Sequence, residues 1–147
     1  MKIRKRKMHL EFDSCPENEG FARSAAAAFI TPLDPTMDEL VEIRTAVSEA
    51  VSNCVIHGYA GGEGIIAMEC EIQEDGRLLI IIRDQGCGIR DVKLAMEPMY
   101  STNTDGERSG MGFTVMESFM DHVRVKSVFG KGTEVLMIKH LDVGYEG

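Results

Sequence analysis

The sequence lacks any apolar run of the roughly 18 residues that a membrane-spanning helix needs. Its basic beginning leads into a polar strand pattern and not into the apolar core of a signal peptide. We therefore expect a cytoplasmic protein that makes no membrane contact. Cys-x-x-Cys pairs are also absent, and the 4 cysteines are widely spaced without histidines at ligand spacing, so we expect neither zinc nor disulfides.

The sequence also lacks an excess of positive charge, with 16 Lys and Arg against 24 Asp and Glu. The net charge of −8 at pH 7 argues against a general nucleic-acid binder, because affinity for phosphate backbones comes mainly from clustered lysine and arginine. A short basic run at residues 2–7 is the exception and is typical of a solvated chain end. No repeat, Gly/Ser/Pro tract or change of composition divides the 147 residues, so we expect one domain over residues 1–147.

Periodicity predicts the first elements. Apolar and polar residues alternate from Met8 to Phe12, as in a half-buried strand. Ser14 and Glu17 have the spacing of a capping box and predict a helix that ends near Ile30.

Thr36 and Glu39 repeat the capping-box spacing and predict a second helix that ends near Gly58. Two strands should follow, joined by a turn at Asp75 and Gly76. The second contains the continuous apolar run Leu78–Ile82, which predicts a buried central strand.

Residues 98–110 are rich in Ser, Thr, Asn, Asp and Gly and have the length of a functional lid. A helix over 111–121 and a hairpin of strands 123–129 and 133–138 should follow. The fold class is therefore α+β: a two-layer α/β sandwich whose mixed, mainly antiparallel sheet is covered on one face by helices.

Glu49, Asn53 and His57 are spaced four apart and share one stripe of the second helix. A solvated polar face is one interpretation. However, asparagine is a poor residue for a helix interior, and the surrounding segment is strongly apolar. The alternative is hard-cation chemistry, in which Asn53 offers its carbonyl oxygen to Mg²⁺ and Glu49 orients an attacking hydroxyl or accepts its proton.

Asp84, Gly86 and Gly88 follow the predicted buried strand. They could form an ordinary turn. A buried carboxylate can also accept a hydrogen bond from an exocyclic amine such as that of adenine, while glycines let the backbone lie against a flat ring. Thr133 opens the last strand and could place its hydroxyl beside Asp84.

The residues Ser109, Gly110, Met111 and Gly112 join the lid to the next helix. Exposed amides at a helix N-terminus attract phosphate, although the glycines could simply confer flexibility. The sequence contains neither a Gly-x-x-x-x-Gly-Lys-Ser/Thr loop nor a His-Arg-Asp catalytic loop, which excludes the common P-loop and eukaryotic kinase designs.

In this order, the motifs of Glu49 with Asn53, Asp84-x-Gly86-x-Gly88, Gly110-x-Gly112 and Gly132-Thr133 resemble the ATPases and kinases that include gyrase, the Hsp90 chaperones, histidine kinases and MutL. The likeness covers nearly the whole chain and gives the fold a name, the Bergerat-type ATP-binding fold. The segments 33–40, 47–53, 56–59 and 107–113 most resemble the anti-sigma factor kinases of spore-forming bacteria.

The resemblance implies a homodimeric serine/threonine-protein kinase that binds ATP or ADP with Mg²⁺, sequesters sigma factor F and phosphorylates an anti-anti-sigma protein on a serine. It implies Glu49 as the catalytic base, Asn53 as the Mg²⁺ ligand and Asp84 as the adenine anchor.

Further roles follow from the same resemblance. The nucleotide would also contact Gly86, Gly88, Ser109, Gly110, Met111, Gly112 and Thr133. Arg108 would reach the γ-phosphate or a partner, and Arg23 would be a partner contact or a plain surface charge.

Three alternatives share parts of this pattern. A sensor histidine kinase needs a phosphoacceptor histidine on a helical hairpin, which this sequence does not offer. The anti-sigma factor of the general stress response would use the same pocket residues with another sigma factor. A non-catalytic module could sequester sigma and use ATP only as a conformational ligand.

Overall fold

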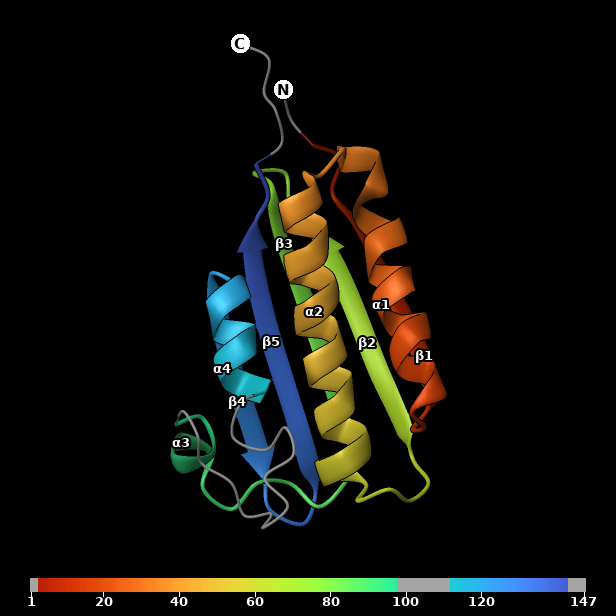
Figure 1. Cartoon of the computed structure of the whole chain (residues 1–147), viewed down its shortest axis with the longest axis vertical. Coiled ribbons are helices and arrows are strands. Elements are labelled where there is room, and N and C mark those ends of the chain that lie inside the picture. The colour runs from red at the N-terminus through yellow and green to blue at the C-terminus, as the bar shows by residue number, and fades with distance from the viewer. Residues whose placement is uncertain (1–2, 98–111, 143–147) are drawn as a thin grey trace.

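The computed structural model describes residues 3–97 and 112–142. Figure 1 shows how the elements follow one another and how the helices lie across the sheet. In chain order these elements are β1 (Arg6–Asp13), α1 (Glu17–Ile30), a 3₁₀ turn (Thr31–Leu33), α2 (Met37–Asn53), a π-helical turn (Cys54–Gly58), β2 (Ile65–Ile72), β3 (Arg77–Asp84), α3 (Val92–Ala95), α4 (Gly112–Phe119), β4 (His122–Val128) and β5 (Gly132–His140).

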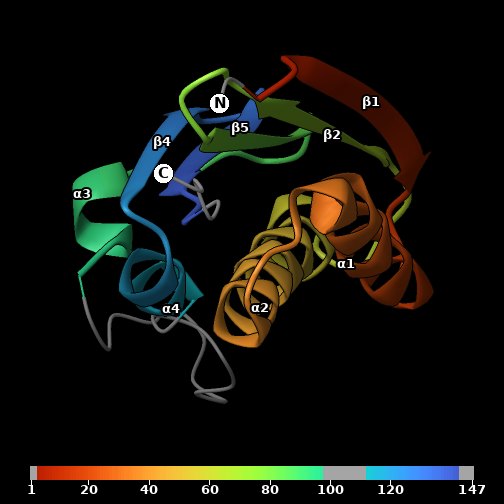
Figure 2. The same ribbon diagram turned by 90° about the horizontal axis from the view of Figure 1, so that it is seen from above.

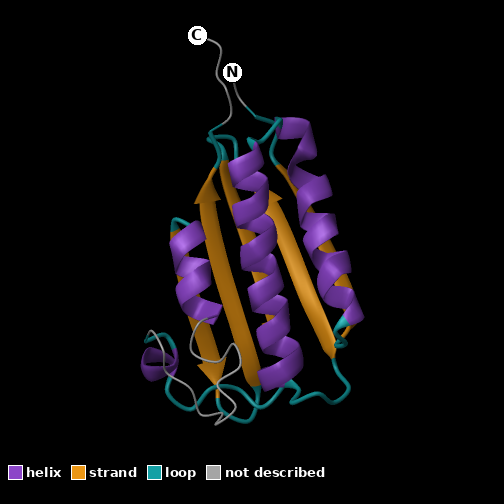
Figure 3. Ribbon diagram, in the orientation of Figure 1, coloured by secondary structure: helices purple, strands orange, loops and turns teal. Residues whose placement is uncertain are grey.

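The five strands of the described residues, orange in Figure 3, form one sheet. Their order is β1-β2-β3-β5-β4, so β3 lies at the centre of the sheet and β1 and β4 form its edges. All four pairings are antiparallel among the described residues. The sheet is therefore more uniform than the mixed, mainly antiparallel sheet that we expected. The central position predicted for the apolar strand is confirmed.

Helices α1, α2 and α4 lie on the same face of the sheet, as Figure 2 shows from above. This arrangement confirms the two-layer sandwich. Helix α2 begins at the predicted capping box, where the Glu39 amide donates to the Thr36 hydroxyl (3.0 Å) and the Thr36 amide donates to the Glu39 carboxylate (2.9 Å). No helix in the described part of the chain is long and apolar enough to cross a membrane.

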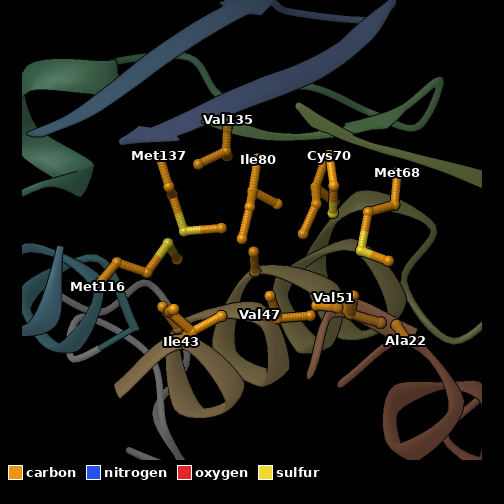
Figure 4. Packing of buried hydrophobic residues seen from close by; sticks show 14 of the residues in the cluster. Ala22, Ile43, Val47, Val51, Met68, Cys70, Ile80, Met116, Val135 and Met137 are labelled. Carbon is orange, nitrogen blue, oxygen red and sulfur yellow. The ribbon is translucent and has the colours of Figure 1, made fainter. Parts of the chain in front are cut away.

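The core lies between α2 and the sheet (Figure 4). Its fully buried side chains come from both layers and include Ile43, Val47 and Val51 on α2, Met68 on β2, Ile80 on β3, Met116 on α4 and Met137 on β5. Burying each of these side chains contributes about 1.5–3 kcal/mol, so this interface supplies much of the folding free energy.

The apolar run in β3 is not buried throughout, contrary to our expectation. Leu78, Ile80 and Ile82 are buried under the helices, whereas Leu79 and Ile81 are only half-buried. Successive side chains of a strand point to opposite faces of the sheet. The described helices cover only one of these faces, so Leu79 and Ile81 lie on the other.

The capping box predicted at Ser14 and Glu17 is wrong. Helix α1 has Pro16 at its N-cap without a side-chain cap, and the buried Ser14 hydroxyl has no hydrogen-bond partner among the described residues. The Ser14 amide instead donates to the Gly64 carbonyl (2.8 Å) at the start of β2. Tertiary pairing between the ends of β1 and β2 therefore overrides the local signal. The four-residue helix α3 was not predicted, and the lid at 98–110 lies outside the described residues.

Candidate functional site

A cavity of about 400 Å³ opens where β3 ends, β5 begins and the last turns of α2 meet α4. Its volume lies within the usual range of about 300–1,000 Å³ for small-molecule sites. The lining includes Asn53, Cys54, Asp84, Gly88, Gly112 and Thr133. Five of these six residues were predicted from the sequence as a binding set, and the fold brings them together from α2, β3, β5, α4 and the loop after β3.

Asp84 is the buried charge of this cavity. It is the last residue of β3, points to the same face as Ile82 and is only 7% exposed. Its Oδ1 accepts a hydrogen bond from the Gly86 amide at 2.9 Å. A carboxylate can accept several hydrogen bonds, so Asp84 can also accept one from an amine donor within the cavity.

Gly58 and Gly86 bring the π-helical turn that follows α2 against the loop after β3. A Cβ atom on Gly86 would lie 2.0 Å from the Gly58 carbonyl oxygen, and one on Gly58 would lie 2.7 Å from Asp84 Oδ2. The Cys87 amide donates to that same Gly58 carbonyl at 2.8 Å. The sequence indicated Gly58 only as a helix terminator. Its second role, as the surface against which Asp84 packs, depends on this tertiary contact.

Tyr59 stabilises the same contact between the π-helical turn and the loop after β3 through two hydrogen bonds. Its hydroxyl donates to the Ile65 carbonyl (2.5 Å) and accepts from the Gln85 amide (2.7 Å). Its ring lies where a side chain on Gly64 would otherwise be, since a Cβ there would come within 2.3 Å of the ring. Sequence reasoning missed Tyr59, and the adjacent glycine-rich turn was the signal that could have indicated it.

Cys54 is a further lining residue that the sequence did not indicate. Its side chain is buried at 4% exposure. Burial first, and then the negative charge and hydrogen bond of Asp84, raise the pKa of the Cys54 thiol well above its ordinary value. The group therefore stays a neutral thiol beside the carboxylate.

Asn53 and Gly112 line the cavity where α2 meets α4. A Cβ on Gly112 would lie 3.0 Å from Asn53 Nδ2 and 3.1 Å from Oδ1, so the first residue of α4 packs directly on the amide of Asn53. The N-terminal amides of α4 thus face the same region as Asn53, an arrangement that favours phosphate. Glu49 lies one helical turn earlier on α2, half-buried and outside the residues that line the cavity.

The donor set fits a magnesium nucleotide. Asp84 provides an acceptor for an amine, and Asn53 provides an amide oxygen of the kind that Mg²⁺ binds. Within residues 3–97 and 112–142, no group of three or more His, Cys, Asp or Glu side chains could hold a metal alone. Mg²⁺ usually takes one or two protein ligands together with nucleotide phosphates, so this limited set suits it.

Arg23 lies away from the cavity. Its guanidinium donates to the Ser48 hydroxyl (3.1 Å) and pairs with Glu19 (3.8 Å), which places it between α1 and α2. The predicted contacts Arg108, Ser109, Gly110 and Met111 lie outside the described residues.

Comparison with known proteins identifies the class of protein to which this chain belongs. Residues 12–139 match the family described as histidine kinase-like ATPase domain. Among solved structures, the RsbU and RsbW domains of a Mycobacterium tuberculosis protein superpose with a TM-score of 0.66 at 18% identity, covering 92% of this chain and 32% of that longer one. The mycobacterial sensor histidine kinase MprB superposes with a TM-score of 0.58 at 16% identity, covering 91% and 98% of the two chains. These likenesses show the same ATPase fold.

Relatives with more than 50% identity identify the family within this class of ATPases. The anti-sigma F factor of Priestia megaterium is 51% identical over 138 residues, which is 93% of this chain and 94% of that protein. The anti-sigma F factor of Clostridium novyi is 56% identical over 136 residues, with coverage of 92% and 94%. The chain belongs to the anti-sigma F factor family within the histidine kinase-like ATPases.

Proposed function

We propose that this protein binds and sequesters sigma factor F and uses Mg-ATP to phosphorylate a serine of an anti-anti-sigma partner. One observation carries the kinase part of this proposal. A single cavity joins a buried carboxylate, Asp84, to an amide and a helix N-terminus, Asn53 and Gly112. The similarity to anti-sigma F factors supports the choice of partners.

Asp84 would accept a hydrogen bond from the adenine amine, with the backbone at Gly86 and Gly88 beside the ring. Gly88 has a φ of +73°, and a Cβ atom on it would lie only 2.3 Å from the Val128 carbonyl oxygen. A larger residue in this loop would displace it, so the glycines keep room for a flat base. Thr133 lies opposite Asp84 in the sheet register and contributes a hydroxyl to the same end.

Glu49 and Asn53 would serve the phosphoryl end. Bound Mg-ATP supplies the γ-phosphoryl group and a metal charge that neutralises it. Asn53 would hold the metal through its amide oxygen. Glu49, one turn away on the same stripe of α2, would orient the serine hydroxyl of the partner and accept its proton.

Partner recognition would involve Arg23 and Arg108. The Arg23 side chain is 38% exposed between α1 and α2, so part of it can contact a partner. We also propose a homodimer through the free edge of β1, because an unpaired strand edge invites association. We propose that the whole chain acts as one cytoplasmic kinase domain without contacting nucleic acid.

The test is transfer of labelled γ-phosphate from Mg-ATP to purified anti-anti-sigma protein, with the modified residue identified by mass spectrometry. Glu49→Ala should abolish transfer while ATP and sigma factor F still bind. Glu74→Ala, which removes an exposed carboxylate from the β2–β3 turn at the far end of the sheet, is the matched control and should transfer normally. Unchanged transfer by Glu49→Ala would refute the role of Glu49.

The same experiment separates the alternatives. ATP binding and sigma binding without transfer by the wild-type protein would indicate a non-catalytic sequestering module. Transfer to the general-stress partner proteins in place of the sigma F partners would indicate the sibling function. Arg23→Ala should weaken partner binding, and normal binding of both partners together with normal transfer would remove Arg23 from the interface.

A further inference from the structure

Three polar side chains lie in one row across the sheet, beside the part of the cavity where the adenine base is proposed to bind. Asp84 on β3 is the register partner of Thr133 on β5, and Thr133 is the register partner of Ser127 on β4. Cross-strand partners share a face of the sheet, so all three point toward the helices. The proposed function uses the first two, whereas Ser127 has no assigned role.

The Ser127 hydroxyl makes three hydrogen-bond contacts. It lies 2.8 Å from the Ile89 amide, 3.0 Å from the Gly132 carbonyl and 2.8 Å from the Thr133 hydroxyl. It therefore connects the glycine loop after β3, the first residue of β5 and the hydroxyl that faces the cavity.

The protons in this cluster can be assigned by counting. The Ile89 amide can only donate, and the Gly132 carbonyl can only accept. A serine hydroxyl has one proton, so the contact with Gly132 uses it. The contact with Thr133 can then form only if Thr133 donates. This assignment satisfies all three contacts, whereas donation from Ser127 to Thr133 would leave the Gly132 contact without a proton.

We infer that Ser127 is a positioning residue that sets the specificity for the purine base, by holding the Thr133 proton so that Thr133 presents only acceptor lone pairs to the cavity. This inference rests on the proposed function, because it concerns the nucleotide that the cavity binds. Asp84 and Thr133 then form a pair of acceptors on neighbouring strands. An amine at position 6 of a purine donates directly to such a pair, whereas an oxo group at that position finds two acceptors and no donor.

Ser127 also supports the loop, and the experiment must separate this contribution. The loop residue Cys87 accepts from the Gly130 amide at 2.6 Å, so the loop remains attached to the β4–β5 turn without Ser127. Loss of the Ile89 contact should weaken all purine nucleotides to the same extent. The preference between 6-amino and 6-oxo purines changes only if Thr133 no longer donates its hydroxyl proton to Ser127 and can donate it to the nucleotide.

The experiment measures, by calorimetric titration, the dissociation constants of ATP and of inosine triphosphate, which has an oxo group at position 6 and a proton on N1 where ATP has the amine and a bare N1. The wild-type protein should prefer ATP. In Ser127→Ala the Thr133 hydroxyl is free to donate, so the preference should fall by roughly tenfold, the size of one hydrogen-bond difference. Ser127→Thr keeps the hydroxyl and should keep the preference. Ser118→Ala removes an exposed hydroxyl that donates within α4 (2.9 Å to the Thr114 carbonyl) and should change neither constant.

Each outcome bears on the inference. Equal weakening of both nucleotides in Ser127→Ala, with an unchanged ratio, would reduce Ser127 to a loop support and overturn it. Equal affinity of the wild-type protein for both nucleotides would also overturn it while leaving the ATP site intact. Failure of the wild-type protein to bind ATP would refute the proposed function itself. If Ser127→Ala does not fold, Ser127→Cys fills the same space with a weak hydrogen-bonding group and should lower the ratio in the same direction.

Discussion

Gly86 does not itself line the cavity, but replacing it by alanine should displace the loop whose Asp84, Cys87 and Gly88 do. The new Cβ would lie 2.0 Å from the Gly58 carbonyl oxygen and 2.3 Å from its carbon. Both are backbone atoms, so neither can rotate away as the end of a flexible side chain could. An ordinary contact begins near 3.4 Å, so the two segments must separate by about 1.4 Å.

That displacement breaks two hydrogen bonds. The first runs from the Cys87 amide to the Gly58 carbonyl at 2.8 Å, and the second from the Gly86 amide to the Asp84 carboxylate at 2.9 Å. A neutral hydrogen bond contributes about 1 kcal/mol and one to a charged group about 1.5–3 kcal/mol, so the local loss is about 3 kcal/mol. Because the loop must close again to hold a base, the affinity for ATP should fall by roughly 100-fold.

The assay is calorimetric titration of ATP, with the thermal midpoint measured with and without nucleotide. Gly20→Ala is the matched control, since it makes the same chemical change on α1, where the nearest atom outside the helix backbone is 3.4 Å away in the Arg23 side chain. That variant should gain roughly 0.5–1 kcal/mol of stability and bind ATP normally. If Gly86→Ala binds ATP within threefold of the wild-type protein, the close approach to Gly58 does not shape the site.

Three further predictions follow from individual contacts. Asp84→Asn should weaken ATP binding by roughly 10- to 100-fold in the same titration, because one acceptor of the amine becomes a donor; unchanged affinity would contradict its anchoring role. The exposed Cys87 lines the cavity and should react with iodoacetamide at a rate that ATP lowers, whereas burial raises the pKa of Cys70 to about 12 and should keep it unlabelled until the protein unfolds. Lys139→Met should lower the free energy of unfolding in urea by about 2 kcal/mol, since the Lys139 ammonium donates to the Phe119 carbonyl (2.7 Å) and pairs with Glu42 (2.9 Å); a variant as stable as the wild-type protein would show that these contacts contribute nothing.

Local signals were reliable where a few neighbouring residues decide the structure. The capping box at Thr36 and Glu39 starts α2 as predicted, because both partners lie within one turn of the same helix. The equivalent spacing at Ser14 and Glu17 failed. There the Ser14 amide pairs with Gly64 in a distant part of the sequence, and no window of local sequence contains that information.

Spacing and chemistry left each motif open to an ordinary structural interpretation, and the resemblance carried by their order selected them as one candidate site. Asn53, Asp84, Gly112 and Thr133 of that set line one cavity. Alternation and helical periodicity also determined the two-layer fold, because the 2-residue and 3.6-residue repeats must each bury one apolar face.

Only the tertiary structure decided how these residues act on one another. Gly58 contacts Gly86, and burial together with Asp84 raises the pKa of the Cys54 thiol. In both cases the two residues lie about 30 positions apart in the sequence. The proton on Thr133 depends on Ser127 in the neighbouring strand, and so on the register of β4 with β5. A sequence specifies which groups are present, but strand register and backbone approach set the distances at which hydrogen bonds and charges take effect.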